Sequence, residues 1–336
     1  VDYLKKNKIK GFGPNKIASK LEGSKIFTKN LCKKYHIPTA SFGIFENLNK
    51  AQRFIENCKF PLVIKADGLA SGKGVYICET KDQSKQAVQE IFDGKFGIAT
   101  QILIEEFLVG EEMSFFIISD GKNIKKFGTA QDHKRVGEGD VGPNTGGMGA
   151  YSPSRLENDL LDEKILNKII NPTLKALKDM NVDFEGFLYA GLMIVKNEPF
   201  LIEYNVRMGD PECQTILPRL KTNFFEVVEA TVEKKLDKLD LDWHKSKTIS
   251  IVLCSNGYPE VHEINKEIKD LDKIILRENE FIFHAGTKIL DTKIFSSGGR
   301  VLNIVAQSKS FKESREMVIN LIKKINWKNG FYRKDI

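Results

Sequence analysis

The most informative stretch of the chain is residues 198–212, Glu-Pro-Phe-Leu-Ile-Glu-Tyr-Asn-Val-Arg-Met-Gly-Asp-Pro-Glu. Its apolar run at 200–202 predicts a buried strand. The strand delivers Glu203 and Asn205 at alternate positions, so both side chains leave the same face of the sheet. A carboxylate and a carboxamide are hard oxygen donors of the kind that Mg²⁺ and Mn²⁺ prefer. We therefore predict that Glu203 and Asn205 bind one of these ions, with water and phosphate completing its shell.

Glu-x-Asn by itself also fits the edge of a sheet with an ordinary salt bridge. The residues that follow favour a functional site over that alternative, because Arg207, Asp210 and Glu212 place a cation and two further acids close by. The search for a binding site therefore works outward from this strand.

The composition describes a globular protein with more than one core. At 336 residues the chain is too long for a single ordinary core, so we expect two or three subdomains. Hydrophobic residues make up 41% and charged residues 29%, and no apolar run reaches the roughly 18–20 residues of a membrane span. The five cysteines are scattered without a Cys-x-x-Cys pair, which favours reduced thiols and a cytoplasmic location.

The net charge of +7 raises nucleic acid as an alternative partner. The basic residues are, however, dispersed among nearly as many acids, and the densest cluster lies at 5–10. This pattern favours a solvated basic surface that serves small anionic substrates. We expect no nucleic-acid partner, no membrane partner and a monomeric protein.

The chain starts at Val1 without an initiator Met or a signal peptide, and we expect a fragment. Residues 1–20, punctuated by Gly11, Gly13 and Pro14, are interpreted as a linker.

The apolar patterns after residue 20 alternate between helical and extended periods, which predicts an α+β protein. We expect a helical stretch at 157–180 to be broken or kinked by Pro172, and 137–149 to form a glycine-dense loop. The expected helices cover 24–35, 47–57, 82–92, 211–220, 223–236 and 311–325, and the expected strands cover 61–66, 75–78, 101–107, 112–119, 186–195, 199–204, 248–254, 281–284 and 299–305.

The glycine-bearing turn at 67–74 is not a P-loop. Only three residues separate Gly68 from Gly72, Gly74 stands where the hydroxyl should be, and the turn joins two strands. Such a turn can instead fold over a triphosphate, with backbone N–H groups contacting phosphate. Lys65, at the end of the preceding strand, would then neutralise phosphate charge. The alternative is an ordinary hairpin with a surface lysine.

A second glycine pattern, residues 137–142, matches the dinucleotide fingerprint letter by letter. It follows no convincing strand and runs into Pro143 instead of a helix, so we reject it.

The segment 103–112, Leu-Ile-Glu-Glu-Phe-Leu-Val-Gly-Glu-Glu, resembles the hinge of ATP-grasp enzymes. Two lysines (Lys25 and Lys65), the glycine turn, this hinge, Glu112 and the Glu203-x-Asn205 strand follow one another in the order found in that superfamily. The resemblance implies that the hinge backbone pairs with adenine and that Glu112 holds the ribose hydroxyls.

Further motifs resemble one member family of the superfamily, the phosphoribosylamine–glycine ligases. They are the segments 22–25, 64–74, 131–136, 142–153, 186–192, 284–287 and 297–301. The resemblance implies an ATP-grasp fold of two α+β lobes clasping ATP over 21–240, with a lid subdomain at about 61–129. It also implies a small α+β domain over 241–336 and a family N-terminal domain that is missing here.

The same resemblance implies ligation of glycine to 5-phosphoribosylamine with ATP, through an acyl phosphate, in purine synthesis. The implied ATP contacts are Lys25, Lys65, Gly72, Lys73, Gly74, Glu105, Glu106, Phe107, Leu108 and Glu112. The implied substrate contacts are Asp132, Lys134, Arg135, Asn144, Gly146, Gly147 and Arg207, and the implied catalytic residues are Arg207 and Asp210. A surface role stays open for Lys134 and Arg135.

Phosphoryl transfer needs charge neutralisation and positioning more than a protein nucleophile, so we interpret Cys213 as a packing residue. A closing lid is expected to protect the acyl phosphate from water, with 67–74 and 142–149 as candidates. Another ATP-grasp carboxylate–amine ligase or a carboxylase is the alternative function. Such an enzyme should lack the motifs at 132–135 and 143–151.

Overall fold

The computed structural model describes residues 1–68, 74–97 and 101–336, and its internal contacts divide the chain into two compact units. The first unit comprises residues 1–127, 156–207 and 228–237, and the second comprises 128–155, 208–227 and 238–336. Both contain helices and strands, which confirms the expected α+β class. The predicted domain borders after residues 20 and 240 stay a prediction.

The first unit holds the elements that surround the predicted nucleotide residues. Its helices are α1 (Asp2–Lys6), α2 (Lys20–Gly23), α3 (Lys25–Tyr35), α4 (Leu48–Ile55), α5 (Lys81–Phe92), α6 (Asp159–Ile165) and α7 (Asn171–Asp179). Its strands are β1 (Phe42–Phe45), β2 (Leu62–Ala66), β3 (Val75–Cys78), β4 (Ile102–Glu106), β5 (Glu111–Asp120), β10 (Glu185–Val195) and β11 (Glu198–Asn205).

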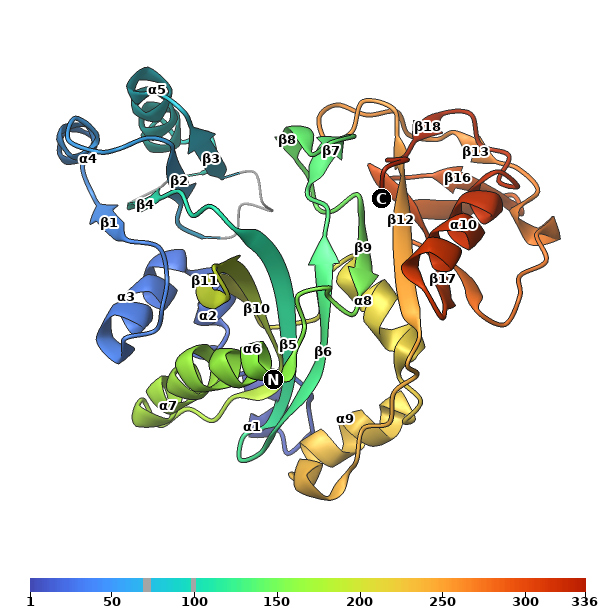
Figure 1. Cartoon of the computed structure of the whole chain (residues 1–336), viewed down its shortest axis with the longest axis horizontal. Helices are drawn as coiled ribbons and strands as arrows, with labels where there is room; N and C mark the ends of the chain where they lie inside the picture. Colours follow the sequence, from blue (N-terminus) through green and yellow to red (C-terminus); the bar gives the residue numbers. More distant parts are fainter. Residues whose placement is uncertain (69–73, 98–100) are drawn as a thin grey trace. The chain divides into compact units, whose positions relative to one another are not determined.

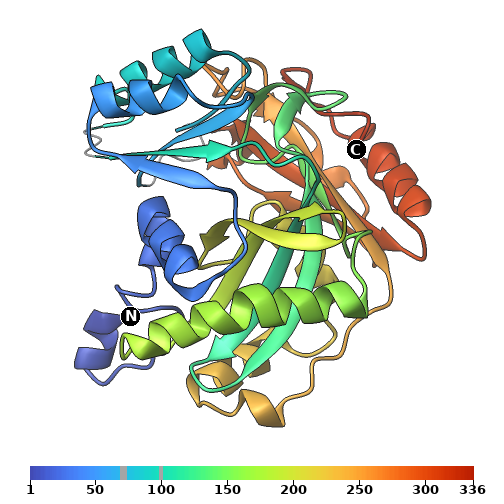
Figure 2. The ribbon, with the colours of Figure 1, turned by 60° about the vertical axis from the view of Figure 1, so that its left-hand side comes forward.

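A small antiparallel sheet of order β1-β4-β2-β3 forms one part of the first unit. Helices α4 and α5 lie side by side on one of its faces (Figure 2). Fully buried side chains from both layers, including Ile64, Ile91 and Ile104, make the core between them. This sheet carries Lys65 on β2 and Glu105 on β4, so the packing of α4 and α5 fixes the strands that bear both side chains.

The strands β11, β10 and β5 form the second sheet region of this unit, in that order and antiparallel. The register places Gly191 of β10 opposite Glu203 of β11. Helices α3, α6 and α7 lie on the same side of the first unit as these strands (Figure 1). Their buried apolar side chains share a core with the strands, which includes Phe115, Leu188 and Ile165.

The helix expected at 157–180 is interrupted, as Pro172 predicts. Between α6 and α7 the chain forms a π-helical turn, Leu166–Ile170, and Pro172 occupies the first turn of α7. Proline lacks the N–H that would continue the α-helical ladder, so the hydrogen-bonding register changes just before it.

Residues 1–20, interpreted as a linker, begin with α1 and pack on the first unit. The Lys5 ammonium pairs with the Glu185 carboxylate at 2.9 Å, and the Phe12 ring packs edge to face on Phe187 with centroids 5.4 Å apart. None of the helices in the described part of the chain combines the length and apolar character needed to cross a membrane.

The second unit is built on strands that follow the order β9-β12-β17-β14, with α10 packed on β12 and β17. Strand β6 (Ile124–Asp132) begins in the first unit and ends in the second. Helix α9 (Phe224–Val232) begins in the second unit and ends in the first. The other elements are α8 (Glu212–Ile216), α10 (Phe311–Ile322), β7 (Arg135–Gly137), β8 (Val141–Asn144), β9 (Gly149–Ser152), β12 (Lys247–Ser255), β13 (Glu267–Ile268), β14 (Glu280–His284), β15 (Thr287–Leu290), β16 (Lys293–Ser296), β17 (Arg300–Ser308) and β18 (Gly330–Phe331).

The prediction of a glycine-dense loop at 137–149 is wrong in part, because β7 and β8 pair within this segment and β9 begins at its end. A buried arginine explains the order of this segment. The Arg333 guanidinium donates to the Arg135 carbonyl at 3.1 Å, to the Asp140 carboxylate at 2.6 Å and, from Nε, to the Asp335 carboxylate at 2.9 Å. The Gly139 N–H donates to the same Asp335 carboxylate. These bonds join residues 333–335 to strand β7 and to the turn of the hairpin.

We predict that Arg333→Met lowers the unfolding free energy by about 1.5–3 kcal/mol, the range for hydrogen bonds to charged groups. The methionine keeps most of the buried volume but removes the donors. Urea unfolding followed by tryptophan fluorescence suits the test, because Trp243 and Trp327 both lie in the second unit. Lys334→Met, an exposed neighbour, is the matched control.

The Arg333 guanidinium holds the pKa of the Asp335 carboxyl well below its usual range. A depressed carboxyl pKa stabilises the folded state above the unfolded pKa, and this contribution is lost as the pH falls. The stability difference between wild type and Arg333→Met should therefore shrink below about pH 4. An equal unfolding midpoint for both proteins at pH 7 would contradict the assigned role of Arg333.

Candidate active site

The first turn of α3 is tied to the strand end that precedes the glycine turn. Ser24 caps the helix by accepting from the Phe27 N–H, and its hydroxyl donates to the Asp67 carboxylate at 3.1 Å. The Ile26 N–H donates to Asp67 at 3.1 Å, and the Lys25 ammonium donates to the Gly68 carbonyl at 2.8 Å. The Asp67 carboxylate thus takes up a free N–H of the helix start, where negative charge is favoured.

A buried carboxylate joins α3 to the small sheet. One oxygen of Glu105 lies 3.0 Å from the Lys65 ammonium, and the other lies 3.2 Å from the Lys29 ammonium. None of the three side chains is more than 6% exposed. Such burial is tolerable for charged groups because they are paired with one another.

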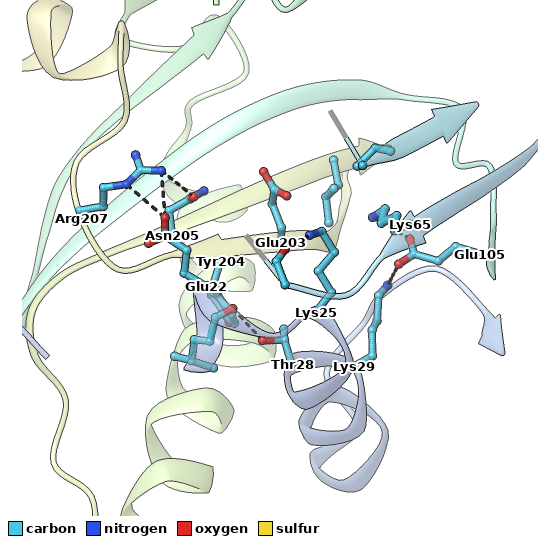
Figure 3. Close-up of a pocket in the computed structure, with 15 residues that line it drawn as sticks. Glu22, Lys25, Thr28, Lys29, Lys65, Glu105, Glu203, Tyr204, Asn205 and Arg207 are labelled. Carbon is cyan, nitrogen blue, oxygen red and sulfur yellow. Dashed lines mark hydrogen bonds and ion pairs between the residues drawn. The ribbon is translucent and has the colours of Figure 1, made fainter. Parts of the chain in front are cut away.

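The strand β11 brings the predicted metal ligands to the same place. The side chains of Glu203 and Asn205 leave the strand on one side, and Lys25 points toward Glu203 (Figure 3). The Arg207 guanidinium pairs with Glu22 at 2.9 Å and donates to the Asn205 side-chain oxygen at 3.3 Å. The second Glu22 oxygen accepts a hydrogen bond from the backbone N–H of Val206.

These groups line a single pocket within the first unit. Its wall contains four basic and three acidic side chains, so it carries a formal surplus of one positive charge (4 − 3 = +1). The lining residues are Leu21, Glu22, Lys25, Thr28, Lys29, Lys65, Gly68, Gly74, Val75, Glu105, Ile202, Glu203, Tyr204, Asn205 and Arg207.

Burial shapes the protonation of the lysines on α3. It lowers the pKa of the Lys25 ammonium, while the Glu203 carboxylate acts in the opposite direction and Lys65 adds to the lowering. Burial likewise lowers the pKa of Lys29, and the Glu105 carboxylate opposes that effect. A nearby negative charge therefore favours the charged form of both lysines. Glu105 provides it for Lys29, and a bound phosphate would add to the effect of Glu203 on Lys25.

The predicted nucleotide contacts divide into those that line this pocket and those that do not. Among the described residues, the pocket is lined by Lys25, Lys65, Gly74 and Glu105. It is not lined by Glu106, Phe107, Leu108 or Glu112. The Glu106 carboxylate instead accepts from the Ser41 N–H and hydroxyl, at 2.8 and 3.0 Å. Glu112 is exposed near the start of β5. Gly72 and Lys73 lie outside the described residues.

The remaining predicted substrate and catalytic residues belong to the second unit, where Arg300 connects several of them. Its guanidinium donates to the Gly146 carbonyl at 2.6 Å and pairs with the Asp210 carboxylate at 3.0 Å. The Gly146 N–H donates to the Tyr258 hydroxyl at 3.0 Å. In the β7–β8 hairpin the register pairs Arg135 with Asn144, and Lys134 precedes it.

Gly147 has a structural reason to be glycine. Its φ is +112°, and an added Cβ would lie 2.4 Å from the Pro211 ring and 2.8 Å from an Asp132 oxygen. The segment 142–149 therefore packs closely against residues of the same unit. Its glycines permit that packing.

The thiol of Cys213 agrees with a packing role. Burial raises its pKa to about 11, with Asp210 and Glu212 adding to the shift. At neutral pH the group is a thiol, and the thiolate is the nucleophilic form.

Sequence reasoning missed Lys29, Glu22 and Arg300. Lys29 could have been found, because it follows Lys25 by one helical turn and therefore shares its face. Glu22 and Arg300 act through partners that are distant in sequence, and no local pattern indicates such pairs.

Comparisons with known proteins identify the family of this chain. Two family models match the chain: Phosphoribosylglycinamide synthetase, ATP-grasp (A) domain, over residues 23–213, and Phosphoribosylglycinamide synthetase, C domain, over residues 248–336. The phosphoribosylamine–glycine ligase of Brucella melitensis is 44% identical over 100% of this chain and 79% of the relative. That of Agrobacterium fabrum is 45% identical with the same coverage.

Solved structures give the same answer. The crystal structure of a phosphoribosylamine–glycine ligase from Thermotoga maritima has a TM-score of 0.88 and 35% identity, and the match covers 97% of this chain and 81% of that one. The biotin carboxylase domain of Hydrogenobacter thermophilus 2-oxoglutarate carboxylase, solved with MgADP, has a TM-score of 0.74. At 14% identity over 98% of this chain and 72% of that one, it shows a shared fold alone. The expected ATP-grasp fold is thereby confirmed, and this chain belongs to the phosphoribosylamine–glycine ligase family.

Proposed function

We propose that this chain uses ATP to join glycine to 5-phosphoribosylamine, and that it forms glycinamide ribonucleotide, ADP and phosphate in de novo purine biosynthesis. The family match over both domains carries the proposal. The pocket supports it, because three lysines line it together with Glu203 and Asn205. A monomeric state and a cytoplasmic location stay predictions.

The chemistry proceeds in two transfers. The terminal phosphoryl group of ATP passes to a carboxylate oxygen of glycine, which gives glycyl phosphate and ADP. The amine of phosphoribosylamine then attacks the glycyl carbonyl carbon, phosphate leaves, and the amine nitrogen loses a proton. Both transfers depend on positioning and on charge neutralisation.

The lysines of the pocket suit the first transfer. Lys65 and Lys25 approach from β2 and α3, and each carries an ammonium group that can offset charge on the phosphates. Arg207, held by Glu22 and Asn205, lies on the same wall and suits the glycine carboxylate or the acyl phosphate. We propose Asp210, which follows Arg207 closely in the sequence, as the other catalytic residue.

The donors on β11 fit a divalent metal ion. The Glu203 carboxylate accepts no hydrogen bond from any residue in the described parts of the chain, and the Asn205 oxygen lies on the same face. No set of three or more His, Cys, Asp or Glu side chains gathers into a metal cage among the described residues. The chain thus offers a partial shell to Mg²⁺ or Mn²⁺. A divalent ion bound there would neutralise phosphate charge during transfer.

The other assignments remain proposals for recognition. We assign adenine to the hinge residues 105–108, the ribose hydroxyls to Glu112, and phosphate contacts also to Gly72, Lys73 and Gly74. For the acceptor we propose residues of the second unit, namely Asp132, Lys134, Arg135, Asn144, Gly146 and Gly147.

An assay of phosphate release tests the reaction. Phosphate should appear only when ATP, glycine and phosphoribosylamine are present together. ATP and glycine form the glycyl phosphate, and phosphate leaves when the amine of phosphoribosylamine attacks it. If another carboxylate substrate supports phosphate release from ATP at least as fast as glycine does, the chain is a different ligase of the same fold.

Glu203→Gln should lower kcat at least about a hundredfold, which corresponds to about 2.7 kcal/mol in the barrier. The substitution keeps the shape but removes the charge that the metal ion needs. Binding of Mn²⁺ in the presence of a non-hydrolysable ATP analogue, followed by electron paramagnetic resonance, should weaken in parallel. Glu198→Gln is the control, because Glu198 lies on the same strand and pairs with surface lysines. Normal turnover and Mn²⁺ binding by Glu203→Gln would remove Glu203 from the site.

Glu112→Ala should reduce the preference for ATP over 2′-deoxy-ATP. A neutral hydrogen bond contributes roughly 0.5–1.5 kcal/mol, and one to a charged group roughly 1.5–3 kcal/mol. The ratio of kcat/KM for the two nucleotides in wild type and variant measures the effect, and the neighbouring exposed Glu111 provides the matched control Glu111→Ala. An unchanged ratio would assign Glu112 to a structural role.

A further inference from the structure

Lys29 is a buried cation that the mechanism above does not use. It lies on α3 with its side chain 3% exposed. Its ammonium donates to the Thr39 hydroxyl at 2.5 Å, lies 3.2 Å from Glu105 and sits 5.5 Å from the centre of the Phe42 ring. A lysine so enclosed loses much hydration, so its partners must compensate for that loss.

The contact between Lys29 and Glu105 is an ion pair without a hydrogen bond. The Glu105 Oε1 atom takes no hydrogen bond from the residues that the structure describes, although the Lys29 ammonium is its close charged neighbour. The Lys29 ammonium donates one hydrogen bond to the Thr39 hydroxyl. Lys29 therefore acts on Glu105 mainly through its charge.

That charge matters for Lys65. Lys29, Glu105 and Lys65 together carry two positive charges and one negative charge. While Lys29 shares the carboxylate, Lys65 keeps part of its positive potential for the pocket. Without Lys29 the carboxylate would neutralise Lys65 alone, and the pair would present no net charge to a phosphate.

The hydroxyl of Thr39 links Lys29 to strand β11, which carries Glu203 and Asn205. It donates to the Leu201 carbonyl at 2.6 Å, and the Leu201 N–H donates to the Pro38 carbonyl at 2.8 Å. Leu201 precedes Glu203 by two positions on β11. Lys29 is thus joined to β4 and β11, both of which contribute residues to the pocket wall.

We propose that Lys29 is a positioning residue for the nucleotide: it neutralises the Glu105 carboxylate so that the Lys65 ammonium stays available to the ATP phosphates. The inference rests on the proposed contact of Lys65 with ATP. It assigns to Lys29 no phosphate contact of its own.

Restoring the charge balance tests this role. Lys29→Met removes one positive charge and should raise the Kd for a non-hydrolysable ATP analogue at least about tenfold, while the KM for glycine changes little. The double variant Lys29→Met/Glu105→Gln returns the group to a net charge of +1. The hinge is proposed to contact adenine through its backbone, so a change in the Glu105 side chain leaves that contact in place. The double variant should therefore bind the analogue within about threefold of wild type. Calorimetric titration gives the Kd values, and thermal unfolding checks the fold of each variant.

Two controls separate this inference from the proposed function. Lys33→Met, on an exposed position of the same helix, should bind as wild type. Lys65→Ala should lose most of the affinity. If Lys65→Ala binds normally, the proposed ATP contact and the inference both fail. If Lys65→Ala loses affinity but Lys29→Met does not, only the inference fails.

The double variant also distinguishes positioning from direct contact. If Lys29 bound phosphate itself or merely supported the fold, adding Glu105→Gln would leave the affinity as low as in Lys29→Met, and that result would overturn the inference. Should Lys29→Met fail to fold, the double variant decides alone. Binding within about threefold of wild type supports the inference, and a Kd raised tenfold or more overturns it.

Discussion

A carboxylate buried between two ammonium groups is stable only while the three charges stay together, and Glu105 stands in that position between Lys29 and Lys65. The three side chains come from α3, β2 and β4, so their burial fixes the helix against the small sheet. The bonds of Asp67 to the first turn of α3 hold the same two layers from the other side of the glycine turn. The pocket is where these layers meet β11.

Much of this arrangement could be predicted because its signals are local. Ser24 supplies the cap expected at a helix start, and the predicted helix at 24–35 matches α3 nearly residue for residue. The apolar runs before Lys65 and Glu203 predict β2 and β11, and alternation alone places Glu203 and Asn205 on one face. Residues chosen on these grounds line one pocket in the structure.

The rest could not be predicted, because it depends on contacts between distant segments. The β7–β8 hairpin has no alternating pattern, and its order comes from the guanidinium of Arg333. Gly147 looks like a source of freedom in the sequence, but its neighbours Pro211 and Asp132 leave no room for a side chain. A glycine-rich segment therefore predicts close packing as readily as motion, and only the tertiary structure distinguishes the two.

The charges of the pocket explain why its acids and bases are both needed. The lysines alone would repel one another in a buried wall, and the acids hold them together before any nucleotide arrives. The resulting surplus of a single positive charge is small beside the several negative charges of a triphosphate. A divalent cation at Glu203 and Asn205 would supply the missing charge at the end of the pocket where Lys25 points toward β11. If the pocket binds phosphate as proposed, its acidic residues are part of the same charge balance as the lysines, and not an exception to it.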